Sequence, residues 1–381
     1  MQRHSLPILL TGVSFLIVVG IVMLVSTCAF SAQASSDDAY REAKRQAVWL
    51  LLGSGVCVWA SLKDYRFWKR GVWWFYGGAA LLLALCFVPG IGMEINGERR
   101  WIGYSAFQLQ PSEFAKIVVV VCVAYWFSRY PDAGQRFGRG FLAPLTLAGA
   151  LIALVLFEVD IGTTAVLAGT VFVMLFVAGV DWRYLTGLTG ASVAGFIAMM
   201  SYAPDRVTRL MAFLDPEAHK LGAGFQQWIS LMAIGSGGLT GRGIGEGRLK
   251  MLYMPFAHTD FIFPMIGEEL GLIFTTLVVI GFIFLCVAGM SIAFHAADRF
   301  GALLATGLTT YLVLQAFLNI GVTTAILPNT GLPLPFISYG GSSLVFSLAA
   351  VGILINIWRQ GVRAEKDRRD LMTARRFTPR P

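Results

Sequence analysis

Apolar stretches long enough to cross a lipid bilayer follow one another along almost the whole chain. A membrane-spanning helix needs about 20 predominantly apolar residues. Hydropathy places such segments near 7–30, 45–62, 72–92, 112–128, 140–157, 162–180, 183–203, 261–291, 300–326 and 342–358. Because 56% of the 381 residues are hydrophobic and only 14% are charged, most of the chain cannot face water. The sequence therefore predicts an all-α integral membrane protein with ten transmembrane helices.

The first apolar segment follows Arg3 and His4 and in that respect resembles a signal peptide. It is longer than the apolar region of such a peptide and further spans follow, so we expect it to remain as the first helix. The five cysteines lie inside apolar segments and are odd in number. We interpret them as small core residues rather than as disulfides, zinc ligands or a redox pair.

Lysine and arginine residues collect on one side of this predicted layout. The loop 63–71 has four basic residues against one acidic, the loop 128–140 has three against one, and the tail from 359 has eight against three. By the positive-inside rule both termini are cytoplasmic. We expect a membrane domain at 1–358 and a basic cytoplasmic tail at 359–381. Attraction to anionic lipid headgroups accounts for the tail's charge, so nucleic acid is not needed as a partner.

This orientation places three segments outside the cell, and all three are expected to be irregular. They are 93–111, the long loop 204–259 between the seventh and eighth helices, and 327–341. Long loops with structure-breaking residues are where function tends to lie, so we expect the chemistry at the exterior face. No internal repeat with corresponding broken helices is recognisable, a pattern that would have favoured a secondary transporter.

Several ionisable or aromatic residues lie at the exterior ends of the predicted helices. Glu113 and Lys116 are three residues apart, so they share a helix face and can pair at the outer membrane edge. The alternative is a capped helix with a lysine that extends to the membrane surface. Trp101 fits an interfacial anchor. Asp160 either caps the helix that follows it or turns into a cavity between helices.

The segment AIGSGGLTGRGIGEGRLKMLYMP, 233–255, is rich in glycine and basic residues. Its spacing matches neither the dinucleotide fingerprint nor the P-loop. Glycines nevertheless allow backbone N–H groups to approach an anion, and Arg242, Arg248 and Lys250 add positive charge. The segment is therefore either a site for a diphosphate at the membrane face or a flexible loop with solvated charges.

The segment PFAHTDFIFPMIGEELG, 255–271, places His258, Asp260, Glu268 and Glu269 at and inside the start of an apolar helix. Asp260 could simply cap that helix. The two glutamates lie roughly 12 to 13 Å further along, where a charge costs about 2.5 to 3.5 kcal/mol on insertion scales. Because adjacent residues are about 100° apart on a helix, we expect that they cannot share one face and that at least one meets a partner or water. A functional role is the first interpretation and a structural ion pair the alternative.

With these residues in view, the chain resembles the SEDS family (shape, elongation, division and sporulation) of bacterial glycan polymerases. The matching motifs are NGERRWI…QPSEFAK, FEVDIGTT, AIGSGGLTGRGIG, HTDFIF…GEELG and LPFISYGGSS, in order from residue 96 to 343. The resemblance is nearer to the division branch, FtsW, than to the elongation branch, RodA, because Gly267 precedes Glu268 and the linker before HTDFIF is compact. Departures from the family pattern include Val159 where proline is usual, Ile229, Pro264 and the pair 329–330.

The resemblance implies a peptidoglycan glycosyltransferase that polymerises lipid II into β-1,4 glycan strands on the outer face of the bacterial cytoplasmic membrane, for septal wall synthesis. Undecaprenyl diphosphate would be the leaving group. The family's essential carboxylate falls on Asp260, which would act either as a general base or as the ligand of a divalent cation. A divalent cation is the one cofactor that the resemblance suggests. The other residues assigned to substrate binding or to the cavity are Trp101, Glu113, Lys116, Asp160, Arg242, Lys250, His258, Glu268 and Glu269.

The implied partners are lipid II, a cognate class B penicillin-binding protein that acts as transpeptidase, and other divisome proteins. Three alternatives stay open: an elongation polymerase of the RodA type, a lipid II flippase, and a scaffold that recruits the transpeptidase. A polymerase needs its carboxylate at the exterior face, where Asp260 is expected. A transporter needs polar groups near the midplane in broken helices.

Overall fold

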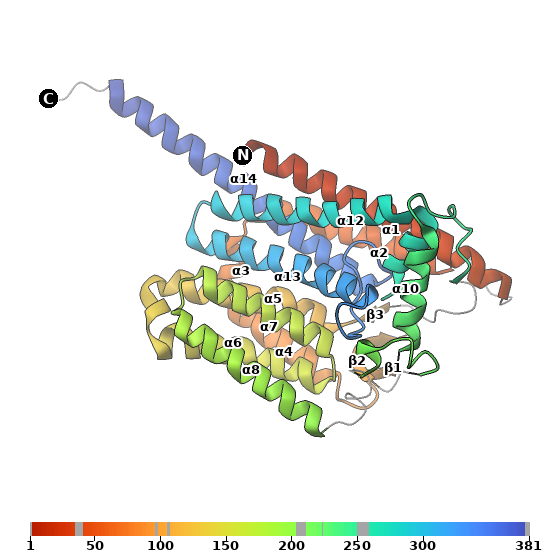
Figure 1. Ribbon diagram of the computed structural model, residues 1–381. Helices are drawn as coiled ribbons and strands as arrows, with labels where there is room; N and C mark the ends of the chain where they lie inside the picture. The colour runs from red at the N-terminus through yellow and green to blue at the C-terminus, as the bar shows by residue number, and fades with distance from the viewer. Residues whose placement is uncertain are drawn as a thin grey trace.

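Long helices packed with their axes roughly parallel make up most of the computed structural model (Figure 1), which confirms the all-α prediction. The structure describes residues 2–34, 41–95, 98–104, 107–202, 211–222, 224–249 and 259–377. The long helices are α1 (Gln2–Ala34), α2 (Arg41–Leu62), α4 (Val72–Leu85), α5 (Pro111–Arg129), α6 (Ala143–Phe157), α7 (Ile161–Val177), α8 (Trp182–Tyr202), α12 (Ile262–Phe294), α13 (Arg299–Thr323) and α14 (Gly341–Phe377). Shorter ones are α3 (Arg66–Arg70), the 3₁₀-helix η1 (Pro131–Gln135), the π-helix η2 (Phe137–Leu142) and α10 (Phe225–Gly237).

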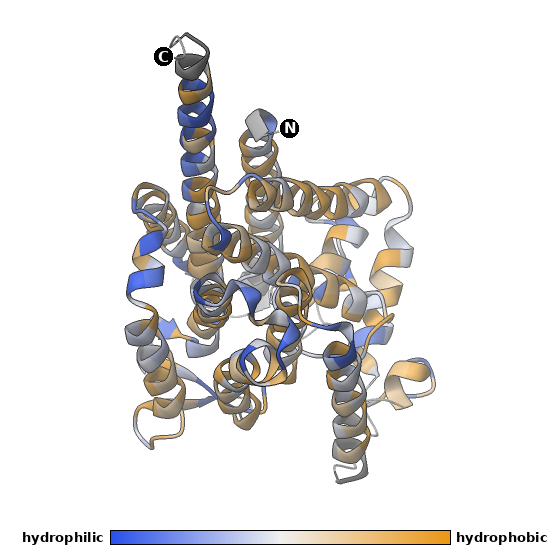
Figure 2. Cartoon of the chain, turned by 90° about the vertical axis from the view of Figure 1, so that its left-hand side faces the viewer, coloured by the Kyte–Doolittle hydropathy of each residue, from blue (hydrophilic) through white to orange (hydrophobic). Residues whose placement is uncertain are grey.

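In the described part of the chain, seven helices are long and apolar enough to cross a membrane, judged by length and composition. They contain α1, α2, α5, η2 with α6, α12, α13 and α14, and α4 and α7 are shorter apolar helices. The chain is therefore a multi-span membrane protein. Each predicted span overlaps one long helix, but the boundaries differ: α4 ends at Leu85 rather than at 92, and α14 continues past 358 to Phe377. Figure 2 shows this last part of α14 projecting beyond the bundle with many hydrophilic residues.

The centre of the bundle is formed by α5 and α13. Every residue of α5 from Ala115 to Ala124 is buried, and Lys116 is the one charged residue among them, as expected for a central helix that is apolar on nearly all sides. Around this centre α2 packs along α14, and α1 and α13 pack along α12. Small residues permit the closest approach, since a Cβ added at Gly352 of α14 would lie 2.3 Å from the carbonyl oxygen of Cys57 in α2.

The segment 93–111 is not irregular, contrary to the prediction. Strands β1 (Gly92–Ile95), β2 (Glu98–Tyr104) and β3 (Phe107–Leu109) form an antiparallel sheet in that order. An Asn-Gly pair stands between the first two strands in the sequence. Such a pair is a strong hairpin signal, and hydropathy does not register it.

The segment 204–259 is not wholly irregular either, because it contains α10 within its described part. This helix buries Ile229 and Ala233 and packs on α12. Its C-terminal loop docks into a break in α12 at Gly271, where φ is 77°. A Cβ at Gly271 would lie 2.3 Å from the backbone nitrogen of Gly241, so only glycine fits there. The break divides α12 into a short first part, which carries Glu268 and Glu269, and a long second part.

Candidate functional site

Asp260 lies two residues before α12 in the sequence, and α12 begins at the end of the bundle that also holds the sheet and α10 (Figure 1). The N-cap residue of α12 is Phe261, which makes no side-chain cap bond. The backbone carbonyl of Asp260 accepts a hydrogen bond from Asn319 Nδ2 at 2.8 Å. A Cβ added at Gly331 would lie 3.5 Å from Asp260 Oδ2. The partly buried carboxylate therefore sits beside the backbone of the loop between α13 and α14.

Polar residues of α13 hold that loop in place. Asn319 Nδ2 also donates to the carbonyl of Leu332 at 2.6 Å, and Gln315 Nε2 donates to the carbonyl of Pro333 at 2.9 Å. Both side chains are buried. The sequence analysis missed them, although two amides four residues apart in an apolar helix are a recognisable signal of an interior polar face.

Glu113 and Lys116 pair as predicted, with 2.8 Å between Oε2 and Nζ, and their side chains are only 2% and 1% exposed. The pair lies inside the bundle rather than at the membrane edge, so the alternative of a lysine that extends to the surface is wrong. Lys116 Nζ also donates to Gln315 Oε1 at 2.5 Å and lies 5.7 Å from the centre of the Tyr311 ring. Through Gln315 the pair supports the loop beside Asp260.

Asp160 caps α7, because its Oδ1 accepts the backbone N–H of Thr163 at 2.9 Å. The same carboxylate accepts from Gln110 Nε2 at 3.3 Å and lies 4.0 Å from an Arg100 guanidinium nitrogen. The cap interpretation is thus confirmed, and the side chain also joins α7 to the segment that leads into α5. A Cβ at Gly162 would lie 2.8 Å from the carbonyl oxygen of Thr330, so the start of α7 contacts the loop that flanks Asp260.

Glu158 was not predicted as a site residue. It is 1% exposed, and neither carboxylate oxygen has a hydrogen-bond partner in the described part of the chain. Burial raises its pKa to about 8, an effect that the charge of Asp160 reinforces and the charge of Arg100 opposes. Glu158 is therefore a neutral acid at pH 7 within the turn between α6 and α7.

The turn itself is strained. Val159 has φ 63°, an unfavourable conformation for a β-branched residue. Arg100 holds it there by donating to the carbonyls of Glu158 at 3.4 Å and of Val159 at 2.8 Å. The usual proline of the family could not adopt this φ, so the departure at Val159 changes the local backbone.

Glu268 and Glu269 are fully buried, and both meet partners, as predicted for at least one of them. Glu268 accepts the backbone N–H of Arg248 at 2.8 Å and that of Leu249 at 3.3 Å. Glu269 accepts the N–H of Gly245 at 3.0 Å and the hydroxyl of Ser26 at 2.6 Å. The two carboxylates have different partners, and the loop after α10 wraps around the end of the short helix and reaches both of them.

These contacts also bear on the predicted diphosphate site. The N–H groups of Arg242 and Gly243 donate to the carbonyls of Glu268 and Glu269, each at 3.0 Å. These two N–H groups and those of residues 245, 248 and 249 all donate to acceptors on α12. The anions that this glycine-rich loop holds through these amides are the two glutamates.

The remaining predicted residues are more dispersed. Arg242 is exposed, and its Nε donates to the carbonyl of Ser236 at 3.3 Å. Trp101 lies on β2, paired with Met93 of β1, and is partly buried. Lys250 and His258 lie outside the described residues. Among the residues that the structure describes, no group of three or more His, Cys, Asp or Glu side chains could hold a metal ion.

Comparison with known proteins decides the family. The model of the FtsW/RodA/SpoVE family, described as cell cycle proteins, matches residues 7–362. The chain belongs to this family. Within it, the chain is 40% identical over 356 residues to the "Probable peptidoglycan glycosyltransferase FtsW" of Geobacter metallireducens, covering 93% of this chain and 95% of that protein. It is 38% identical over 366 residues to the stage V sporulation protein E of Bacillus subtilis, covering 94% and 98%.

Solved structures agree with this membership of the FtsW/RodA/SpoVE family. A chain described under "Structural coordination of polymerization and crosslinking by a peptidoglycan synthase complex" superimposes with a TM-score of 0.77 at 29% identity, covering 92% of this chain and 96% of that one. The rod shape determining protein RodA of Thermus thermophilus superimposes with a TM-score of 0.67 at 27% identity, covering 92% and 95%. The SEDS resemblance inferred from the motifs is thereby confirmed.

Proposed function

We propose that this FtsW-like protein is a peptidoglycan glycosyltransferase that polymerises lipid II into β-1,4 glycan strands. The observation that carries the proposal is the placement of Asp260: its backbone carbonyl is held by Asn319, and its carboxylate lies beside the backbone of Gly331. Relatives about 40% identical over most of the chain carry the name peptidoglycan glycosyltransferase, which supports the same reaction.

In the proposed reaction Asp260 is the general base. Its carboxylate accepts the proton of the 4-hydroxyl of one lipid-linked disaccharide as that oxygen attacks the anomeric carbon of the other. The bond from the anomeric carbon to the diphosphate breaks, and its electron pair leaves with undecaprenyl diphosphate. Direct displacement inverts the anomeric centre, which gives the β linkage when the donor diphosphate is α-linked.

Other residues position this base or bind the substrate. The chain of contacts from Glu113 and Lys116 through Gln315 to Pro333 stiffens the loop beside Asp260. Asp160 fixes the start of α7 against the same loop. Trp101 and the exposed Arg242 are our candidates for contacts with sugar and diphosphate, and we assign His258 and Lys250 to the same role from the sequence alone.

In the part of the chain that the structure describes, no three His, Cys, Asp or Glu side chains lie close enough together to hold a metal ion by themselves. A divalent cation shared between one carboxylate and a substrate diphosphate would need fewer protein ligands.

We further propose ten transmembrane spans with both termini in the cytoplasm of the bacterium and the long loop between α8 and α12 outside. The basic segments 63–71, 128–140 and 359–377 lie at the opposite end of the bundle from Asp260 (Figure 1), which supports this orientation by the positive-inside rule. Asp260 then faces the exterior, where the disaccharide of lipid II is presented.

A role at the division septum is supported by the higher identity to FtsW proteins than to the solved RodA, 40% against 27%. The sporulation relative at 38% makes spore wall synthesis the nearest alternative. We propose a class B penicillin-binding protein as partner, supported by the similarity to a chain from a complex that couples polymerization and crosslinking.

The test uses the purified full chain with its cognate class B penicillin-binding protein and labelled lipid II in liposomes. We expect Asp260→Asn to abolish glycan products while membrane insertion and partner binding persist. Asp132→Asn, an exposed change on η1 at the other end of the bundle, serves as the matched control and should polymerise normally. Equal product from both variants would exclude Asp260 as the base, and loss of partner binding by Asp260→Asn would point to a structural role.

One observation favours a lipid II flippase as second candidate. The break at Gly271 interrupts an apolar helix beside buried Glu268 and Glu269, and interrupted helices are typical of transporters. Both carboxylates are nevertheless held by loop amides, so they are not free to bind cargo. Transfer of fluorescent lipid II between leaflets by the purified protein, without glycan formation, would establish this alternative.

A further inference from the structure

At the end of the bundle away from Asp260, a cavity of about 400 Å³ opens between three elements. They are the turn between α2 and α3, the turn between α12 and α13, and the part of α14 just beyond its apolar segment. Three arginines line it, Arg66, Arg359 and Arg363, together with Asp64 and Asp367. None of these residues takes part in the site described above.

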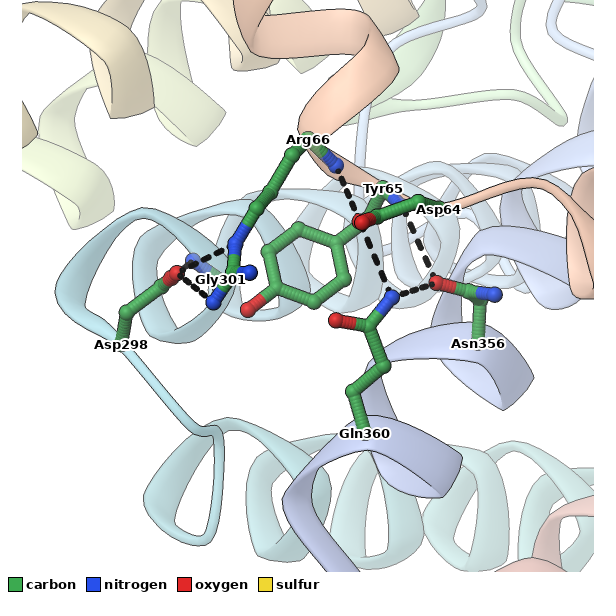
Figure 3. A network of polar contacts seen from close by, with 7 residues as sticks. All are labelled: Asp64, Tyr65, Arg66, Asp298, Gly301, Asn356 and Gln360. Carbon is green, nitrogen blue, oxygen red and sulfur yellow. Dashed lines mark hydrogen bonds and ion pairs between the residues drawn. The ribbon is translucent and has the colours of Figure 1, made fainter. Parts of the chain in front are cut away.

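The wall of the cavity is a continuous hydrogen-bond network (Figure 3). Asp64 Oδ1 accepts from the backbone N–H of Arg66 and from Gln360 Nε2, both at 2.9 Å. Gln360 Nε2 also donates to Asn356 Oδ1 at 2.9 Å, and that oxygen accepts the backbone N–H of Tyr65 at 3.0 Å. The network fixes the α2–α3 turn against α14, so the cavity is built by the fold rather than by loosely placed surface side chains.

A second acidic residue of this region is also engaged. The guanidinium of Arg66 donates from Nε and a terminal nitrogen to Asp298 Oδ2, each at 3.3 Å. The other oxygen of Asp298 caps α13 by accepting the N–H of Gly301 at 2.8 Å. Asp64 and Asp298 therefore already have donors, and neither forms an ion pair with the arginines of α14.

Arg359 and Arg363 are four residues apart and so lie on one face of α14, one turn from each other. In the described part of the chain neither makes an ion pair, a hydrogen bond or a ring contact. Asp367, a further turn along, is exposed at the rim and forms no ion pair with Arg363. The cavity thus presents two adjacent guanidinium groups that form no ion pair with a carboxylate in the described part of the chain.

We propose that this cavity binds a phosphate group through Arg359 and Arg363, carried either by an anionic phospholipid headgroup or by a soluble phosphate compound. Guanidinium groups recognise phosphate oxygens with paired hydrogen bonds. Basic pockets between helices at the cytoplasmic membrane surface are known to take lipid headgroups. Arg359 directly follows the apolar part of α14, and the rim residue Leu62 is 66% exposed, so an acyl chain has an apolar surface beside the cavity.

The experiment measures lipid retention, so it is independent of polymerase activity. The purified full chain is placed in mixed micelles with equal phosphatidylglycerol and phosphatidylcholine, and bound lipids are counted by native mass spectrometry. The test variant is Arg359→Gln with Arg363→Gln. The control is Lys366→Gln with Arg368→Gln, which removes the same charge from exposed positions of α14 outside the cavity.

We expect the unaltered chain to retain phosphatidylglycerol preferentially. One arginine near a membrane surface contributes about a fivefold preference for an anionic lipid. The preference for phosphatidylglycerol should therefore fall about 25-fold in the test variant and change little in the control variant. A chain with no preference for phosphatidylglycerol, or an equal loss in both variants, would overturn the proposal unless inorganic phosphate binds instead. A second arm therefore titrates inorganic phosphate into lipid-depleted protein and follows its unfolding temperature. Stabilisation that is lost only in the test variant would identify a soluble phosphate compound as the source, and failure of both arms would refute the site.

Discussion

The buried pair of Glu113 and Lys116 gives the sharpest test of the packing argument. Lys116→Met would keep an apolar side chain of similar length in α5 but would leave the Glu113 carboxylate, 2% exposed, without its cation. It would also remove the donor to Gln315 Oε1. We expect the variant to be strongly destabilised even though the residue lies away from the proposed chemistry.

The size of the effect follows from the geometry. At 2.8 Å between Nζ and Oε2, the Coulomb attraction is about 6 kcal/mol with an effective dielectric constant of about 20. Desolvation offsets much of this in the intact pair, but removing one partner typically costs about 3 to 5 kcal/mol. The double variant Glu113→Gln with Lys116→Met removes both charges and should recover a large part of that loss.

The assay is the free energy of unfolding in mixed micelles of dodecyl maltoside and sodium dodecyl sulfate. The pair formed by Glu94 and Arg99 is the matched control, because its atoms are 3.2 Å apart but its side chains are half exposed. Arg99→Met should cost about 0 to 1 kcal/mol. If Lys116→Met costs no more than Arg99→Met, or if the double variant is less stable than Lys116→Met, the reasoning is wrong.

Three further predictions concern Glu158, Gly271 and Glu268. The pKa of Glu158 is raised to about 8, so the folded state holds a proton that the unfolded state releases above about pH 4.5. Stability should therefore fall by up to about 1.4 kcal/mol per unit between about pH 5 and 8, and Glu158→Gln should flatten that dependence in unfolding curves. Gly271→Ala should give little folded protein by size-exclusion chromatography, because of its φ of 77° and the contact with Gly241; Gly149→Ala, with open space around it, should behave normally. Glu268→Gln should speed hydrogen exchange of the amides of Arg248 and Leu249, since charge-assisted bonds worth about 1.5 to 3 kcal/mol are weakened; exchange no faster than in the exposed Glu246→Gln variant would contradict the role of Glu268 in holding this loop.

Local patterns in the sequence predicted the local contacts well. Helical spacing allowed the pairing of Glu113 with Lys116 to be predicted, and position before an apolar run allowed the cap by Asp160, because both interactions are made within a few residues. The structure decided between these contacts and the alternatives left open. The apolar segments likewise predicted a multi-span helical protein, since bilayer thickness sets helix length independently of tertiary contacts.

Contacts between distant segments could not be read in the same way. The Gln315 side chain that receives Lys116 is 199 residues away in the chain. The break at Gly271 exists because the loop after α10 docks there, and no local signal distinguishes that glycine from others in apolar helices. The amides that hold Glu268 come from a loop that the sequence suggested as a diphosphate site, whereas the anion that they hold is a side chain of the protein itself.

The length of α14 has a mechanical consequence. It is one helix of 37 residues, about 55 Å long at 1.5 Å per residue, whereas the hydrocarbon core is about 30 Å thick. Its first turn touches the segment leading into α5, where Ser342 accepts the N–H of Gln110 at 3.4 Å. A continuous helix of this length can transmit a force applied along its axis at the charged C-terminal part to its first turn on the other side of the bilayer. There Gln110 also donates to Asp160, so no other helix has to change its conformation.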